Sequence, residues 1–152
     1  MSVKILMVCL GNICRSPLAE GILKSKLDSE KFFIDSAGTG HWHIGKAPDK
    51  RSINVAKKNK IDIAAQKCRQ FQVIDFDAFD IIYAMDSSNF FDLMDLAPDE
   101  KSKNKIKLIL DEIYPTEKVD VPDPYYGTEN GFDQVFVLLD DVCEVIANRL
   151  KS

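Results

Sequence analysis

A cysteine and an arginine near the start of the chain have the spacing of a loop that binds a tetrahedral oxyanion. Cys9 follows an apolar run, and Arg15 and Ser16 follow it after five intervening residues, in the sequence CLGNICRS. A loop of this length can turn its backbone amides toward an anion, with the thiol beneath it and the guanidinium on two of its oxygens. These residue types predict phosphate ester chemistry through a cysteine.

The predicted position of this loop, between a strand and a helix, would make Cys9 a nucleophile. A helix N-terminus and a neighbouring arginine both favour the thiolate, so Cys9 is expected to be ionised at neutral pH and to attack without a separate base. Gly11 and Asn12 are expected to supply left-handed backbone angles. Two plainer interpretations remain open: Cys9 is a small core residue that ends a strand, or the C-x5-R spacing arises by chance.

A candidate proton donor lies near the other end of the chain. Asp123 stands between two prolines and is followed by Tyr125, Tyr126 and Gly127. The prolines restrict the backbone on both sides of the carboxylate. A rigid carboxylic acid could protonate a leaving group and then activate water. The alternative is an ordinary turn before the last helix.

The apolar pattern predicts the elements that position these groups. Strands are expected at 3–8, 32–35, 81–85 and 106–110, and the strand at 32–35 is expected to end at residues 36–38. Ser16 is expected to cap a helix that starts at Pro17, and further helices are expected at 49–59, 88–96 and along the apolar stripe from Phe132 to Leu150. This alternation predicts one α/β domain over residues 1–152, with a four-stranded parallel sheet and helices on both faces.

Composition narrows the classes of partner and the location. The net charge of −4 provides no polybasic stripe, so neither nucleic acid nor a membrane is expected as a partner. The apolar start is interpreted as a buried strand and not as a signal peptide. The four cysteines have the spacing of neither a disulfide scaffold nor a zinc site, which favours reduced thiols in a cytoplasmic protein.

At this point the chain resembles the low-molecular-weight protein tyrosine phosphatases. The resemblance rests on CLGNICRS at 9–16 and DPYYG at 123–127, with DSAG at 35–38, Trp42, Asp80 and Met85-Asp86 between them in the expected order. It implies a flavodoxin-like sheet in the strand order 2-1-3-4. It also implies hydrolysis of phosphotyrosine and aryl phosphate monoesters through a cysteinyl-phosphate, with neither a metal nor another cofactor.

The resemblance also implies a role for each matching residue. Cys9 would be the nucleophile, Arg15 would bind the phosphate, and Asp123 would be the general acid and base. The remaining members of the phosphate-binding loop would be Leu10, Gly11, Asn12, Ile13, Cys14 and Ser16. Ser16 would donate a hydrogen bond to the sulfur, and Ser36 would support Asn12. One departure is Gln66, which stands where better-known members carry a histidine in the supporting network.

Aromatic residues are expected to line a deep slot that selects phosphotyrosine. Trp42, Tyr125 and Tyr126 are the candidate walls, with Leu10 and Ile13 at the rim. His41 and His43, on either side of Trp42, are interpreted as solvated loop residues and not as metal ligands.

The other cysteines have two possible uses. Cys14 either fills space behind the loop or forms a reversible disulfide with Cys9 under peroxide, which would make it a redox site. Cys68 and Cys143 are expected to pack in the interior.

Two other functions stay open at this stage. A thiol-dependent arsenate reductase uses a similar loop, but its relay needs further cysteines, and 83–110 contains none. A catalytically silent phosphotyrosine-binding module could dispense with Cys9 or Asp123, and both are present. The expected partners are phosphotyrosine proteins or peptides, with phosphate and other oxyanions as competitive ligands, and the chain is expected to be a monomer or weak dimer.

Overall fold

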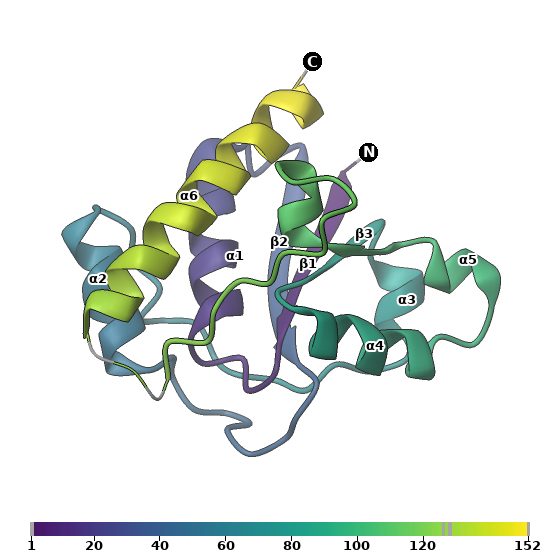
Figure 1. Cartoon of the computed structure of the whole chain (residues 1–152), viewed down its shortest axis with the longest axis horizontal. Coiled ribbons are helices and arrows are strands. Elements are labelled where there is room, and N and C mark those ends of the chain that lie inside the picture. The colour runs from purple at the N-terminus through teal and green to yellow at the C-terminus, as the bar shows by residue number, and fades with distance from the viewer. Residues whose placement is uncertain (1, 126, 128, 152) are drawn as a thin grey trace.

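The computed structural model describes residues 2–125, 127 and 129–151 and has a parallel sheet at its centre (Figure 1). Within these residues the sheet has four strands in the order β2-β1-β3-β4, and every neighbouring pair is parallel. The strands are β1 Val3–Cys9, β2 Phe32–Gly38, β3 Ile81–Ala84 and β4 Ile106–Leu108. The strand order implied by the resemblance is therefore confirmed.

The register of the sheet brings three strand ends to one edge. Cys9 at the end of β1 pairs with Gly38 at the end of β2, and Val8 pairs with Ala84 at the end of β3. Loops that leave this carboxyl edge meet above the sheet, where ligands bind in open α/β folds.

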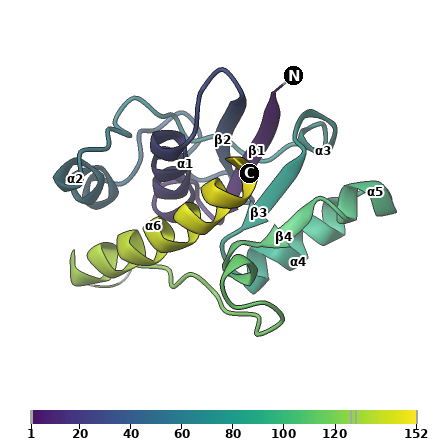
Figure 2. The same cartoon turned by 90° about the horizontal axis from the view of Figure 1, so that it is seen from above.

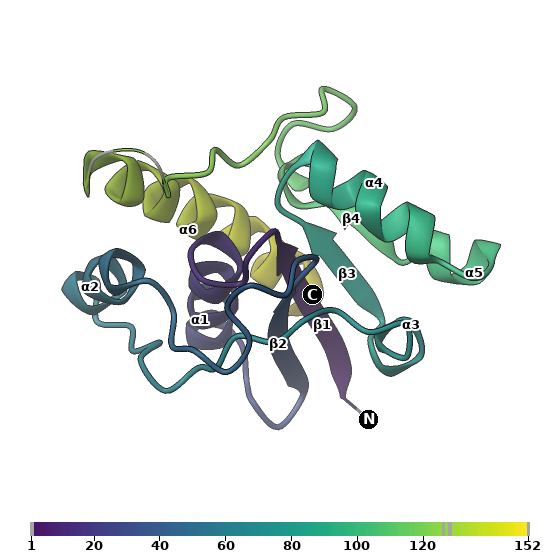
Figure 3. The same ribbon diagram turned by 90° about the horizontal axis from the view of Figure 1, so that it is seen from below.

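Helices cover both faces of the sheet, as the alternating pattern predicts (Figures 2 and 3). The helices that pack on one another along one face are α1 Arg15–Lys26, α2 Lys50–Lys58 and α6 Glu129–Lys151. The other elements are α3 Asp75–Ala78, α4 Ser87–Leu96, α5 Glu100–Lys103 and the 3₁₀ turn Ile109–Glu112. The short helices α3 and α5 were not predicted.

Side chains of β1 alternate between two apolar cores. Ile5 and Met7 pack with α1 and α6, whereas Leu6 and Val8 pack in the second core, with Phe76 of α3. All four β1 side chains are fully buried, which explains why this strand shows as a nearly unbroken apolar run. The predicted stripe of α6 is also buried, apart from Leu150, which is partly covered.

Several predicted boundaries are wrong by a few residues. Strand β3 ends one residue early at 84, and β4 ends at 108 because residues 109–112 coil into a 3₁₀ turn, whereas β2 ends at residue 38, within the range predicted for its end. Asp49 is the cap of α2, and its side chain accepts a hydrogen bond from the Arg51 amide. Helix α1 begins at Arg15, and Ser16 does not cap it, because its hydroxyl faces the Cys9 sulfur.

Candidate functional site

Most carbonyl groups of the loop between β1 and α1 accept hydrogen bonds from other protein groups. The carbonyls of residues 9, 10, 13 and 14 accept hydrogen bonds from Thr39, Gly40, Asp49 and Leu18, and the Asn12 carbonyl accepts one from the Cys68 thiol. Within the described residues, the amides of residues 10–15 donate to no protein group. Six adjacent donors at the start of a helix form an anion-binding site.

Asn12 supplies the left-handed turn of this loop, with φ of 58°. The prediction for Gly11 is wrong, because its φ is not in that region. The site has little room for a side chain at Gly11, because a Cβ there would come within 3.2 Å of the His43 ring. A side chain there would press on a residue that lines the same cavity.

A buried chain of hydrogen bonds holds the Cys9 sulfur. The Sγ of Cys9 lies 3.0 Å from the Ser16 hydroxyl, and the Asn12 amide donates to that hydroxyl at 2.9 Å and to Ser36 at 3.0 Å. Ser36 donates in turn to the carboxylate of Glu20 at 2.6 Å. Because Asn12 donates to the Ser16 oxygen, the hydroxyl proton of Ser16 is left for the sulfur. The Cys9 sulfur therefore has a hydroxyl donor within hydrogen-bond distance.

Arg15 is almost fully buried and held by groups far along the chain. Its Nη1 donates to Asp86 at 2.6 Å and to the Val121 carbonyl at 3.0 Å, and its Nη2 lies 3.6 Å from the Asp123 carboxylate. Burial disfavours the charged guanidinium, but Cys9, Asp86 and Asp123 outweigh burial and raise the pKa of Arg15. The guanidinium therefore stays charged in a fixed orientation.

A cavity of about 390 Å³ opens above the loop. Its lining contains the two cysteines of the loop together with Leu10, Ile13, Trp42 and Tyr125, which were predicted to form the walls and rim. The full set is Cys9, Leu10, Gly11, Ile13, Cys14, Trp42, His43 and Tyr125. His43 therefore belongs to the cavity wall, whereas His41 is exposed and stacks on Trp42. Tyr126, the third predicted aromatic wall, lies outside the described residues.

Asp123 lies on a loop that its own side chain helps to shape. One carboxylate oxygen accepts a hydrogen bond from the Tyr125 amide at 3.0 Å, and the other lies toward Arg15. The side chain is partly exposed. The structure thus places a carboxyl group with access to solvent beside the guanidinium, more than a hundred residues away in sequence.

Cys14 lies in the same cavity wall as Cys9, and both thiols are buried and free. Burial, together with the negative charges of Asp49, Cys9 and Asp123, raises the pKa of Cys14 to about 12. Cys14 is thus a neutral thiol at physiological pH. Cys68 and Cys143 are buried as predicted.

Gln66 does not take the place of a supporting residue that binds Asn12. Its side-chain amide donates to the Pro17 carbonyl in the first turn of α1, and the Asn12 side-chain oxygen instead accepts from the Arg69 amide. Gln66 therefore supports the helix and makes no hydrogen bond to Asn12 within the described part of the chain.

Gly38 lets the loop pack directly on the end of β2. A Cβ at this position would lie 2.7 Å from the Leu10 carbonyl oxygen and about as close to the backbone of Gly11 and Asn12. We expect Gly38→Ala to displace the loop and to lower kcat/KM for an aryl phosphate by ~100-fold, the cost of about 1 Å of misplacement. Steady-state kinetics and a thermal melt measure this effect.

Gly131→Ala is the matched control for that substitution. A Cβ at Gly131 would meet Pro124 at 3.6 Å, which is an ordinary contact, so this variant should keep its activity. Equal kinetics for Gly38→Ala and Gly131→Ala would show that the loop tolerates the displacement.

Three positioning groups were missed or left without a role by the sequence analysis. Asp86 and the Val121 carbonyl bind Arg15, and Glu20 ends the chain of hydrogen bonds that begins at the Cys9 sulfur. Asp86 follows the carboxyl end of β3, the edge where β1 also ends, and this position could have identified it. Glu20 and Val121 carry no comparable signal.

No helix among the described residues is both long and apolar enough to cross a bilayer. No group of three or more histidine, cysteine, aspartate or glutamate side chains among them is arranged to hold a metal ion.

The chain matches characterised proteins along nearly its whole length. Residues 4–152 match the family model described as low molecular weight phosphotyrosine protein phosphatase. A protein of that name from Schizosaccharomyces pombe is 40% identical, and the alignment covers 99% of this chain and 97% of that protein.

Solved structures of tyrosine phosphatases also match nearly the whole chain. A protein tyrosine phosphatase from Entamoeba histolytica, with Hepes in its active site, has a TM-score of 0.91 and 41% identity and covers 99% of this chain and 97% of its own. Wzb from Vibrio vulnificus, in complex with benzylphosphonate, has a TM-score of 0.88 and 31% identity and covers 98% and 99% of the two chains.

Proposed function

Since the chain belongs to the low molecular weight phosphotyrosine protein phosphatase family, we propose that it hydrolyses phosphotyrosine and other aryl phosphate monoesters through a cysteinyl-phosphate. The observation that carries this proposal is the Cys9 sulfur in a cavity whose loop presents six amides that bind no protein group in the described part of the chain, with the buried guanidinium of Arg15 held beside Asp86. This is a preformed site for a phosphoryl group and a nucleophile.

In the first step, the thiolate of Cys9 attacks phosphorus and the aryl oxygen leaves. The loop amides and Arg15 stabilise the charge on the three equatorial oxygens. Asp123 protonates the leaving phenolate, which requires its carboxyl group to be neutral at that moment. Its side chain lies toward Arg15 and is partly exposed, so it can exchange protons with solvent.

In the second step, water displaces the Cys9 sulfur from phosphorus. Asp123, now ionised, removes a proton from that water, and the Ser16 hydroxyl at 3.0 Å stabilises the departing thiolate. Phosphate is released, and the loop returns unchanged because its hydrogen bonds to Ser36, Arg69 and Asp49 involve atoms that take no part in the reaction.

The cavity walls favour an aromatic leaving group. Trp42 and Tyr125 line the opening with about 59% and 37% of their surfaces exposed, and Leu10 and Ile13 complete an apolar rim. Aromatic contacts of this kind add about 0.5–1.5 kcal/mol beyond burial. Benzylphosphonate, the ligand of the Vibrio vulnificus structure, has the same combination of a ring and a tetrahedral anion.

Hydrolysis of p-nitrophenyl phosphate without added metal tests this function. We expect a burst of p-nitrophenol followed by steady release, and faster turnover of a phosphotyrosine peptide than of the matching phosphoserine peptide. A parallel assay of thioredoxin-coupled arsenate reduction should give no turnover. Reduction of arsenate without hydrolysis of aryl phosphates would contradict the proposal.

The proposed partners follow from the same chemistry, and they are phosphotyrosine-containing proteins or peptides. Phosphate and other oxyanions should compete with them, because they fill the same loop. The four free thiols fit a reducing, cytoplasmic location. The monomer or weak dimer expected from the sequence stays a prediction.

Cys14 is proposed to protect Cys9 from irreversible oxidation. Peroxide oxidises the Cys9 thiolate to a sulfenic acid, the Cys14 sulfur attacks it, and the disulfide forms with loss of water. Cys14→Ser should then recover far less activity than wild type, by about tenfold, when thiol is added after peroxide treatment. Equal recovery, measured by p-nitrophenyl phosphate turnover, would contradict this role.

A further inference from the structure

A second hollow lies beside the catalytic cavity and shares a wall with it. This groove, of about 350 Å³, is lined by Leu10, Thr39, Gly40, Trp42, Asp92, Asp95 and Leu96. Leu10 and Trp42 also line the catalytic cavity, so the two hollows are neighbours that share these side chains as a wall. A peptide whose phosphotyrosine enters the cavity would therefore have neighbouring residues at the groove.

The shared wall is ordered by its surroundings. The Trp42 ring lies against the backbone of Gly40, where a Cβ would come within 1.9 Å of the ring, and it stacks on His41 at 5.5 Å between ring centroids. The Gly40 amide donates to the Leu10 carbonyl, which joins this segment to the phosphate-binding loop. An exposed tryptophan held in this way provides a fixed surface for a substrate.

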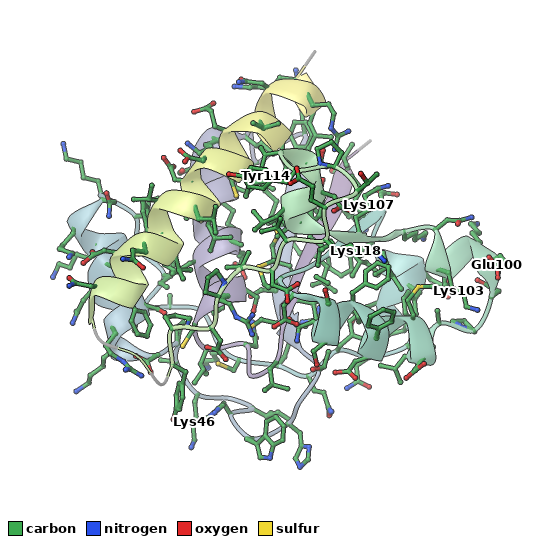
Figure 4. All side chains as sticks on the ribbon, viewed as in Figure 1. Lys46, Glu100, Lys103, Lys107, Tyr114 and Lys118 are labelled. Atoms are coloured by element: carbon green, nitrogen blue, oxygen red, sulfur yellow. The ribbon has the colours of Figure 1, made fainter. Side chains whose placement is uncertain are left out.

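The far side of the groove is acidic. Asp92 and Asp95 are three residues apart on α4, so their side chains share one face of the helix, and both are exposed. Neither carboxylate has an ion pair or a hydrogen bond within the described residues. Lys46, on the segment between β2 and α2, points away from the body of the protein (Figure 4).

Two unpaired carboxylates beside an apolar surface fit one kind of side chain. A lysine or arginine has an aliphatic stem that can cover Trp42 and Leu96, and a cationic end that can reach Asp92 and Asp95. An acidic side chain would be repelled by the same carboxylates. The charge of the groove therefore discriminates between substrates that present the same phosphotyrosine.

We propose that this groove binds a lysine or arginine of the substrate, within about four residues of the phosphotyrosine, a span set by ~3.5 Å per extended residue. The proposal rests on the phosphatase function proposed above and specifies its substrate class: phosphotyrosine in a basic sequence context. Asp92 and Asp95 are then specificity-determining residues that take no part in the chemistry.

Matched phosphotyrosine peptides test this assignment. One peptide set carries lysine at a single position near the phosphotyrosine, and the others carry alanine or glutamate at that position. We expect kcat/KM for the best lysine peptide to exceed that for its alanine counterpart by about fivefold, the scale of one exposed ion pair, and glutamate to lower it. The difference should shrink as salt increases.

The double variant Asp92→Asn/Asp95→Asn should lose this preference while its turnover of p-nitrophenyl phosphate stays at the wild-type value. Asp77→Asn/Asp141→Asn is the matched control, because it removes the same charge from exposed residues on α3 and α6 and should keep the preference.

Three results would overturn the proposal. Wild-type protein could treat lysine and alanine peptides alike, the groove variant could keep the preference, or the control variant could lose it equally. In each of these cases normal turnover of p-nitrophenyl phosphate would leave the phosphatase function intact. Wild-type protein that hydrolyses no aryl phosphate would instead overturn the proposed function, and this inference with it.

Discussion

Cys9→Ser should lower kcat for aryl phosphates by about 10⁴-fold or more, as loss of a catalytic nucleophile does in other enzymes. The hydroxyl of serine does not ionise near neutral pH, so the preformed loop would hold a phosphate with no nucleophile beneath it. Inorganic phosphate should bind this variant at least as tightly as wild type. The reason is that the loop amides and Arg15, which bind the anion, are unchanged in this variant.

Cys143→Ser provides the control for this prediction. Cys143 is fully buried on α6, with its thiol 3.9 Å from the Ala19 carbonyl, and it does not line the catalytic cavity, so the substitution removes no group from the site. This variant should retain turnover. Calorimetric titration with phosphate and p-nitrophenyl phosphate kinetics measure the two properties separately. Residual turnover of Cys9→Ser above ~1% of wild type would show that the sulfur is not the nucleophile.

Asp123→Ala should slow the enzyme to an extent that depends on the leaving group. Phenolate is a poor leaving group and needs the proton, so phenyl phosphate turnover should fall by about 10²–10⁴-fold. p-Nitrophenolate leaves readily without a proton, so turnover of p-nitrophenyl phosphate should fall far less. KM should not rise, because the substitution removes a negative charge 3.6 Å from Arg15 Nη2.

Two further variants separate proton donation from loop structure. Asp123→Asn keeps an oxygen for the hydrogen bond from the Tyr125 amide but cannot donate the carboxyl proton, so it should behave like Asp123→Ala. Asp123→Glu should recover part of the phenyl phosphate activity. An equal loss for all leaving groups across this series would mean that Asp123 shapes the loop and is not the acid.

The fold was predictable where burial leaves a clear pattern in the sequence. Strand β1 is buried on both faces and α6 on one, so their apolar residues form a run and a stripe. The end of β4 was misjudged because Ile109 and Leu110 continue the apolar run while packing in the core as a 3₁₀ turn. The helices α3 and α5 have four residues each, too few to display a helical period.

The site was predictable where chemistry is concentrated in a short segment. The loop from Cys9 to Ser16 contains a nucleophile, an arginine and the turn residue within eight positions. Ser16 was misassigned as a cap because the sequence does not show that its hydroxyl meets a sulfur and an amide in the folded protein. Glu20 is one of 24 acidic residues, and only the fold reveals that it supports Ser36.

The hydrogen-bond partners of Arg15 are translated long after the arginine itself. Asp86 lies 71 residues and Val121 106 residues beyond the arginine, so both must be translated before the guanidinium is fixed. A nascent chain that ends before β3 has the nucleophile and the amides but an unanchored cation. We therefore expect the orientation of Arg15 to be fixed only after residues 86 and 121 have both joined the chain.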